Sequence, residues 1–226
     1  MQKLSCQVRR FIEQNIQYID AKNYDQLYAK ACEQEIQEDL TQVLLSTKIE
    51  FLTHITHFVP YMFKGTTIDQ LVVPQVIDRI PYYCFQECTS LNQITLNNNI
   101  RIINKRAFAS CTSLKSIEIP DSVEELEMYA FYHCSNLENI RLPHKISKIS
   151  DGLFCCCENL TSISLPDTVT EIGTYAFLQS KIETIYFDGT KEQWKKIVKK
   201  RYFRSSSVLK TIVCSDGTIH LPGMRY

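Results

Sequence analysis

The chain has 226 residues, 44% of them hydrophobic, so it can bury a sizeable core, and disorder over most of its length is excluded. Lys plus Arg and Asp plus Glu number 25 each, and this balance excludes a strong overall charge that would draw the protein to nucleic acid or to an anionic membrane. No run of about 18 apolar residues predicts a membrane span, and the N-terminus lacks the apolar stretch of a signal peptide, so we expect a cytoplasmic protein.

Apolar residues recur at helical spacing in the N-terminal part, which predicts three short amphipathic helices near residues 5–19, 23–31 and 36–46. Asn23 followed by Gln26 has the form of a capping box that opens the second helix. Helices this short bury little surface alone, whereas the end of a stacked fold needs a cover. Residues 1–60 are therefore expected to be an N-terminal helical cap, with a separate binding module as the alternative.

His54 and His57 form an H-x-x-H pair in the segment that follows. A metal or catalytic site would need further ligands, and the neighbouring sequence supplies none. We interpret the pair as polar residues of a partly buried linker.

A phrase of the form Ala-Phe-x-x-Cys-x-x-Leu then repeats along the chain. Its phenylalanines are Phe63, Phe85, Phe108, Phe131, Phe154 and Phe177, which lie 22 or 23 residues apart. A period in the low twenties is typical of a solenoid, in which each repeat forms one coil. Residues 61–187 are therefore predicted to form a solenoid of about six 23-residue coils.

Each coil is expected to contain two short strands on opposite walls. In the third coil, residues 114–120 read Leu-x-x-Ile-x-Ile-Pro, the alternation of a half-buried strand that ends at proline. Val123 and Leu126 form a second apolar pair that returns along the other wall. The outward strand positions, free to vary without touching the core, are the candidate binding residues: Gln93, Thr95, Ser116, Glu118, Asn139, Arg141, Ser162, Ser164, Thr184 and Tyr186.

The ten cysteines do not by themselves indicate a disulfide framework, because the repeat period accounts for Cys88, Cys111, Cys134 and Cys157 as buried thiols. The alternative is a metal or redox site, for which the candidate residues are Cys155-Cys156-Cys157 and the pair Cys84 and Cys88. Neither group has paired Cys-x-x-Cys spacing or a matching histidine pair, so we expect no metal and no cofactor.

Residues 188–226 are predicted to form a C-terminal cap made of a helix and a hairpin. Thr190 and Gln193 form a capping box, and the helix that it opens carries Trp194, Ile197 and Val198 on one face. Two strands, 210–214 and 218–221, are joined through Ser215-Asp216-Gly217 and are expected to extend the sheet of the solenoid.

A basic run follows Trp194 and is the one feature that favours nucleic-acid binding. Its residues are Lys195, Lys196, Lys199, Lys200, Arg201 and Arg204, with Tyr202 and Phe203 among them. Lysine and arginine would contact phosphates while the aromatic rings stack on bases. The alternative, a solvated outer face of the capping helix, is favoured because a capping helix must present a polar outer face on which lysines are ordinary.

The segment that starts at Ile119, IPDSVEELEMYAFYHCSNL, resembles the BspA-like class of leucine-rich repeats. The resemblance covers about residues 63–187, and residues 187–194 are similar to the segment that often follows the last repeat in that family. It implies a repeat protein that binds other molecules, with no catalytic motif to transfer. Two coils depart from the pattern, because residues 64–67 replace the cysteine corner of the first coil and Asn97 replaces the proline of the second.

We therefore expect a non-catalytic protein–protein interaction module that uses the outward strand face. The chain has no glycine-rich phosphate loop, no nucleophile elbow and no recognisable pair of catalytic carboxylates. Resemblance to compact repeat proteins of bacteria and their phages suggests a phage or mobile-element protein that engages a host protein, such as one of an immune system. The alternatives are a cell-surface adhesin or glycan-binding repeat protein, and nucleic-acid binding through the basic C-terminal helix.

Overall fold

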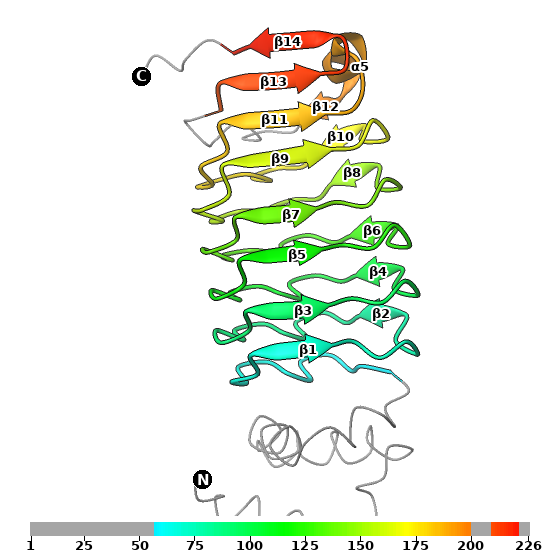
Figure 1. The fold of residues 1–226 in the computed structure, drawn as a ribbon, viewed down its shortest axis with the longest axis vertical. Helices are drawn as coiled ribbons and strands as arrows, with labels where there is room; N and C mark the ends of the chain where they lie inside the picture. Colours follow the sequence, from blue (N-terminus) through cyan, green and yellow to red (C-terminus); the bar gives the residue numbers. More distant parts are fainter. Residues whose placement is uncertain (1–56, 200–208, 222–226) are drawn as a thin grey trace, which may run out of the picture.

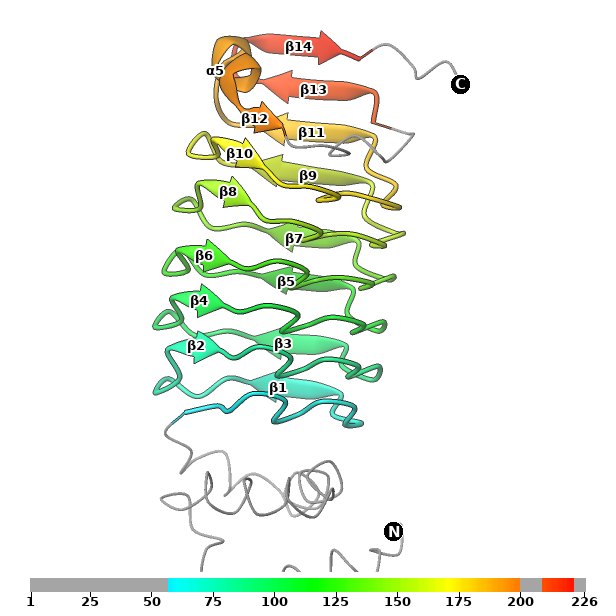
Figure 2. The same ribbon diagram turned by 180° about the vertical axis from the view of Figure 1, so that it is seen from behind.

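The computed structural model describes residues 57–199 and 209–221, and this part of the chain winds into a β-solenoid (Figure 1). The front wall contains β1 (Gln70–Val72), β3 (Gln93–Thr95), β5 (Ser116–Glu118), β7 (Asn139–Arg141), β9 (Ser162–Leu165) and β11 (Thr184–Phe187). The back wall, seen in Figure 2, contains β2 (Arg79–Ile80), β4 (Ile102–Ile103), β6 (Glu125–Leu126), β8 (Lys148–Ile149) and β10 (Glu171–Ile172). The predicted solenoid of about six coils with two strands in each is confirmed.

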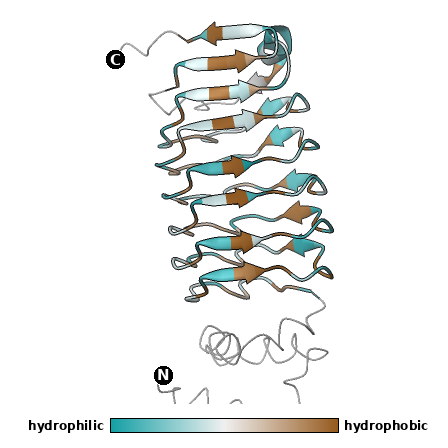
Figure 3. Cartoon of the chain, viewed as in Figure 1, coloured by the Kyte–Doolittle hydropathy of each residue, from teal (hydrophilic) through white to brown (hydrophobic). Residues whose placement is uncertain are grey.

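The repeat period sets the register of the strands. Gln70 pairs with Gln93 and Ser116 with Asn139, so each residue lies beside its equivalent in the next coil. The front wall divides into three ladders, β1-β3, β5-β7 and β9-β11 continued by later strands, and the back wall into β2-β4-β6 and β8-β10 with one later strand. Polar and apolar residues alternate along the strands (Figure 3), as residues that point to opposite faces of a strand require.

The repeated phenylalanines form the centre of the core. All six rings are at most 1% exposed, and consecutive rings stack with centroids 4.9, 5.2, 5.4, 5.9 and 6.1 Å apart. Phe58 packs edge-on against Phe63 and Phe85 and covers the first end of the row. This arrangement extends one continuous core along the solenoid.

A second row, of thiols, runs beside the rings. The cysteine three residues after each phenylalanine donates its S–H to the phenylalanine carbonyl of the preceding coil: Cys88 to Phe63, Cys111 to Phe85, Cys134 to Phe108 and Cys157 to Phe131, at 2.8 to 3.1 Å. Thr66 and Ser180 occupy the same position in the first and sixth coils and donate to their own coils' phenylalanine carbonyls, each at 2.8 Å. These four cysteines are buried, as the period predicts.

The two coils that depart from the repeat pattern are full members of the stack. In the first coil, β1 pairs with β3 and β2 pairs with β4. In the second, the buried side chain of Asn97 donates to the carbonyls of Pro74 at 2.6 Å and Ile77 at 3.0 Å, and its own oxygen accepts from the N–H of Asn99 at 2.7 Å. The amide therefore ties the second coil to the first at the position where other coils have proline.

The C-terminal cap is a modified coil. Helix α5 (Lys191–Lys196) has the predicted capping box between Thr190 and Gln193. Strand β13 (Thr211–Cys214) pairs in parallel with β11, and β14 (Gly217–His220) closes the predicted hairpin. The prediction that Val198 lies on the helix is wrong, because the chain extends at Ile197 and β12 (Val198–Lys199) pairs with β10 on the back wall.

The structure gives limited support to the predicted helical caps. The three N-terminal helices predicted before residue 57 lie outside the described residues. Within the described ranges α5 is the one α-helix, so the C-terminal cap contains a helix of six residues and three strands. The division of the chain at residues 60 and 187 stays a prediction, and the core cluster includes both Phe187 and Trp194.

Candidate functional site

The ten sequence-predicted positions lie together on the outer face of the front wall. Nine are exposed and Thr184 is half-buried, while the strand residue between each pair packs inward. Val72 on β1 occupies the same column as Thr95 and is 72% exposed, so it extends this face by one coil. The sequence prediction did not include Val72, although the 23-residue register locates it.

A groove of about 690 Å³ crosses this face at the junction of β3 and β5. Its lining is Asn92, Gln93, Ile94, Thr95, Leu96, Asn98, Ser116, Ile117, Glu118, Pro120, Asp121, Ser122 and Arg141. Five of the ten predicted positions are among them. The groove lies where the β1-β3 ladder ends and the β5-β7 ladder begins.

Arg141 closes one side of the groove through a cluster of charges. Its guanidinium donates to a carboxylate oxygen of Asp121 at 2.9 Å and lies 3.5 Å from a carboxylate oxygen of Glu118. The second oxygen of Asp121 accepts from the backbone N–H of His144 at 3.2 Å. The bond from Arg141, supported by the one from His144, holds the pKa of Asp121 below its ordinary value, so this carboxylate is charged at neutral pH.

The lining suits recognition of a polar, hydrogen-bonding surface. The side-chain amide of Gln93 and the hydroxyls of Thr95 and Ser116 stand exposed along both strands of the groove. A charged cluster at one end fixes the position of Arg141 without burying it, since 44% of its side chain stays exposed. Tyr186 lies on β11, at a distance from the groove, with 47% exposure.

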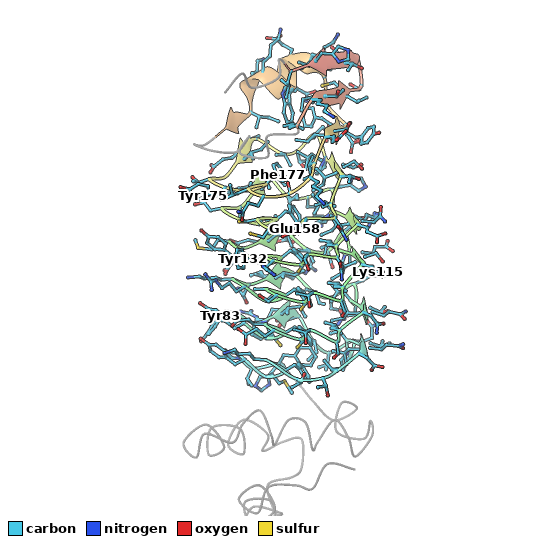
Figure 4. All side chains as sticks on the ribbon, turned by 90° about the vertical axis from the view of Figure 1, so that its left-hand side faces the viewer. Tyr83, Lys115, Tyr132, Glu158, Tyr175 and Phe177 are labelled. Carbon is cyan, nitrogen blue, oxygen red and sulfur yellow. The ribbon has the colours of Figure 1, made fainter. Side chains whose placement is uncertain are left out.

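A second cluster, missed from the sequence, lies along the corner of the coils. Tyr83, Arg106, Tyr129 and Tyr175 stand two residues before a repeated phenylalanine, and Tyr132 stands one residue after Phe131. Figure 4 shows Tyr83, Tyr132 and Tyr175 towards one edge of the stack, and Lys115 towards the opposite edge. The guanidinium of Arg106 lies over the rings of Tyr129 and Tyr132, with centroid distances of 5.3 and 5.8 Å. No carboxylate among the described residues forms an ion pair with Arg106, and its Nε is buried without a hydrogen-bond partner. The periodic position of Tyr83, Arg106, Tyr129 and Tyr175 was a signal that could have located the cluster.

The described residues do not bring together a metal-binding group of three or more His, Cys, Asp or Glu side chains. Of the H-x-x-H pair, His54 lies outside the described ranges and His57 is exposed. His133, His144 and His220 lie on different coils.

The basic run offered as an alternative nucleic-acid site does not form a single helix. Helix α5 ends at Lys196, and Lys199 belongs to strand β12. Lys195 forms an ion pair with Glu192 at 3.1 Å. Lys200, Arg201 and Arg204 lie outside the described residues. The six basic residues therefore do not share one helical face.

The profile of the BspA type leucine-rich repeat region matches residues 31–137 and 78–210, with six copies of the repeat. The chain therefore belongs to the BspA-type leucine-rich repeat family, whose members generally serve as binding modules and not as enzymes.

Among solved structures, the chain is similar to the leucine-rich repeat protein TpLRR of T. pallidum, with 31% identity and a TM-score of 0.50, over 52% of this chain and 58% of that one. A leucine-rich repeat protein of Bacteroides ovatus is 18% identical with a TM-score of 0.43, over 72% of this chain and 59% of that one. The chain thus spans 58% and 59% of these two relatives. Among curated proteins, none matches this chain. In the part of the chain that the structure describes, no helix combines the length and the apolar character needed to span a membrane.

Proposed function

We propose that the protein is a non-catalytic protein-binding module and that its partner docks on the outer face of the front wall, centred on the groove between β3 and β5. The groove is the observation that carries this proposal, because it joins five outward positions of three successive coils into one hollowed surface. The side chains that line it are not required by the core, so they are available for recognition.

The chemistry of the groove favours a protein partner over a glycan. A protein surface presents backbone and side-chain donors and acceptors that match amides, hydroxyls and the exposed guanidinium of Arg141. The lining residues, all within the described part of the chain, include no aromatic ring that could stack on a sugar. Tyrosine and arginine are enriched among residues that dominate binding energy, which favours Arg141 and Tyr186 as anchors.

A steric test compares two exposed serines, one on the front wall and one on the back wall of the solenoid. Ser116 lines the groove on β5, and Ser147 directly precedes β8 on the back wall. We expect the Ser116→Trp variant to lose the proteins that the wild-type chain captures from a bacterial lysate, and the Ser147→Trp variant to keep them. Equal capture by both variants, measured by quantitative mass spectrometry, would remove the groove from the interface.

The proposal extends to the biological context in which the partner is bound. We propose a cytoplasmic protein of a phage or mobile element that engages a host protein, such as one of an immune system. Support comes from the sequence resemblance to compact bacterial and phage repeat proteins. The identity of the proteins captured by the wild-type chain and lost from Ser116→Trp tests this setting separately from the location of the site.

A further inference from the structure

Two adjacent cysteines in the fifth coil are not explained by the repeat. Cys157 takes the position that the thiol row requires, whereas Cys155 and Cys156 fall one and two residues after Phe154. The equivalent residues of the other coils are Lys64, Gln86, Ala109, Tyr132 and Leu178, then Gly65, Glu87, Ser110, His133 and Gln179. This range of residue types shows that the core does not demand cysteine at either position.

The two sulfur atoms lie side by side. The Sγ atoms of Cys155 and Cys156 are 3.6 Å apart, and the Cys156 thiol donates to the side-chain oxygen of Gln179 at 2.9 Å. The Cys155 thiol has the sulfur of Cys156 as its neighbour and, unlike the thiols of the buried row, donates to no carbonyl of the described residues.

The backbone holds this pair in place. Cys156 has a φ of 63°, and its N–H donates to the carbonyl of Leu178 in the next coil at 2.7 Å. The carbonyl of Cys155 accepts from the N–H of His133 in the preceding coil at 2.8 Å. Coils four and six therefore fix both ends of the dipeptide, and the sulfur separation is preorganised.

The separation of 3.6 Å suits a bridging atom better than a direct bond. A disulfide requires the sulfurs to approach to about 2.05 Å, against the backbone bonds that hold both residues. A soft centre bonded to two sulfurs at about 2.3 Å with a tetrahedral angle spans about 3.8 Å between them, close to the distance observed. Chelation thus needs little movement.

We propose that Cys155 and Cys156 form a two-thiol binding site for soft, thiol-seeking centres of the trivalent arsenic class. Such a centre needs only two protein sulfurs, which is what the site offers. In water, an organoarsenical carries two As–OH groups; each takes the proton of one thiol and leaves as water while an As–S bond forms. Arsenic stays trivalent throughout, so no oxidant or reductant takes part.

Proton balance distinguishes this class from a divalent metal ion. Burial, with the neighbouring Cys156 thiol, raises the pKa of Cys155 to about 12, so a cation such as Zn²⁺ would have to displace a tightly held proton into solvent. The arsenic-bound hydroxyl removes that proton as part of the exchange. Cys156 is 9% exposed and Cys155 4%, and Gln179, whose side-chain oxygen accepts from the Cys156 thiol, is exposed.

The test uses the full chain with Cys6 and Cys32, which lie outside the described residues, replaced by serine. We expect native mass spectrometry to show one phenylarsine oxide bound per chain. Cys155→Ser and Cys156→Ser should each weaken binding by about 100-fold or more, because a single thiol loses the chelate effect. Cys214→Ser is the matched control, since that residue is similarly exposed at 7% but isolated from the pair, and it should bind normally.

A second measurement applies even where a serine variant fails to fold. Without substitution of the pair, labelling with iodoacetamide in denaturant, where the unliganded thiols react, should leave Cys155 and Cys156 unalkylated only when phenylarsine oxide is bound, as read by peptide mapping. The proposal is overturned if no complex forms, if both variants retain full affinity, or if other cysteines are protected instead. Tight binding of Zn²⁺ alone at neutral pH would overturn the assignment of ligand class.

Discussion

The ring of Phe131 stacks between its neighbours, with its centroid 5.4 Å from that of Phe108 and the two planes only 5° apart. Phe154 lies 5.9 Å away on its other side, so Phe131 is packed against both adjacent coils. Because every coil repeats this contact, the stability of the solenoid depends on nearest-neighbour packing along the row.

Replacing Phe131 with alanine should lower the free energy of unfolding by about 3–5 kcal/mol, because the cavity opens onto two coils. Phe177→Ala should cost less, since the Phe177 ring stacks on one phenylalanine of the row, Phe154. Chemical denaturation measures both values, with Ser116→Ala as an exposed control expected within about 0.5 kcal/mol of wild type. Equal losses for Phe177→Ala and Phe131→Ala would contradict nearest-neighbour packing.

The buried thiol row should resist alkylation in the native state. Burial raises the pKa of Cys134 to about 12 and that of Cys111 well above its ordinary value, and the thiolate is the reactive form. Iodoacetamide at pH 8 should therefore label Cys111 and Cys134 only after denaturant is added. Rapid labelling of the native protein at these residues, read by peptide mapping, would show that the row opens readily.

Asn97→Ala should destabilise the protein by about 1–3 kcal/mol, because it removes the donor to the carbonyls of Pro74 and Ile77 in a buried position. Asn98→Ala is the matched control: this neighbouring amide is exposed in the groove, so its loss should leave stability within about 0.5 kcal/mol. Thermal and urea unfolding provide the comparison. If the two variants unfold alike, the amide does not tie the first two coils together.

Gly152→Ala should disturb the corner cluster. Gly152 has a φ of 60°, a conformation that costs alanine about 1 kcal/mol, and an added methyl group would overlap the ring of Tyr129. Displacement of that ring removes the surface on which Arg106 lies. We expect a loss of at least about 1 kcal/mol in the free energy of unfolding, with Ser116→Ala as the exposed control in urea denaturation. An unaffected Gly152→Ala variant would show that Tyr129 can move freely.

The sequence predicted the coils well because the features that form them are periodic. Each phenylalanine, such as Phe131, and each outward residue, such as Arg141, is located by an offset within a period. The end of α5 could not be located in this way, because pairing of Val198 with the back wall overrides the helical pattern of residues 190–198.

The groove depends on contacts between coils that no single repeat contains. Arg141 reaches Asp121 in the preceding coil, and Asn97 bonds to carbonyls of the first coil. The groove lies at the junction of the β1-β3 and β5-β7 ladders, whose strands share one sequence pattern. The sequence could therefore identify the face, while the position of the groove on that face required the structure.

The affinity of the captured partner for the double variant Arg141→Ala, Tyr186→Ala tests the proposed binding face most directly. Both side chains are exposed, so the melting temperature should stay close to that of wild type, since surface ion pairs such as those of Arg141 contribute little to stability. Loss of two anchors should cost 2 kcal/mol or more, about a thirtyfold increase in Kd by isothermal titration calorimetry. An unchanged Kd, together with a lower affinity for Arg106→Ala, would place the partner on the corner cluster and contradict docking on the front wall.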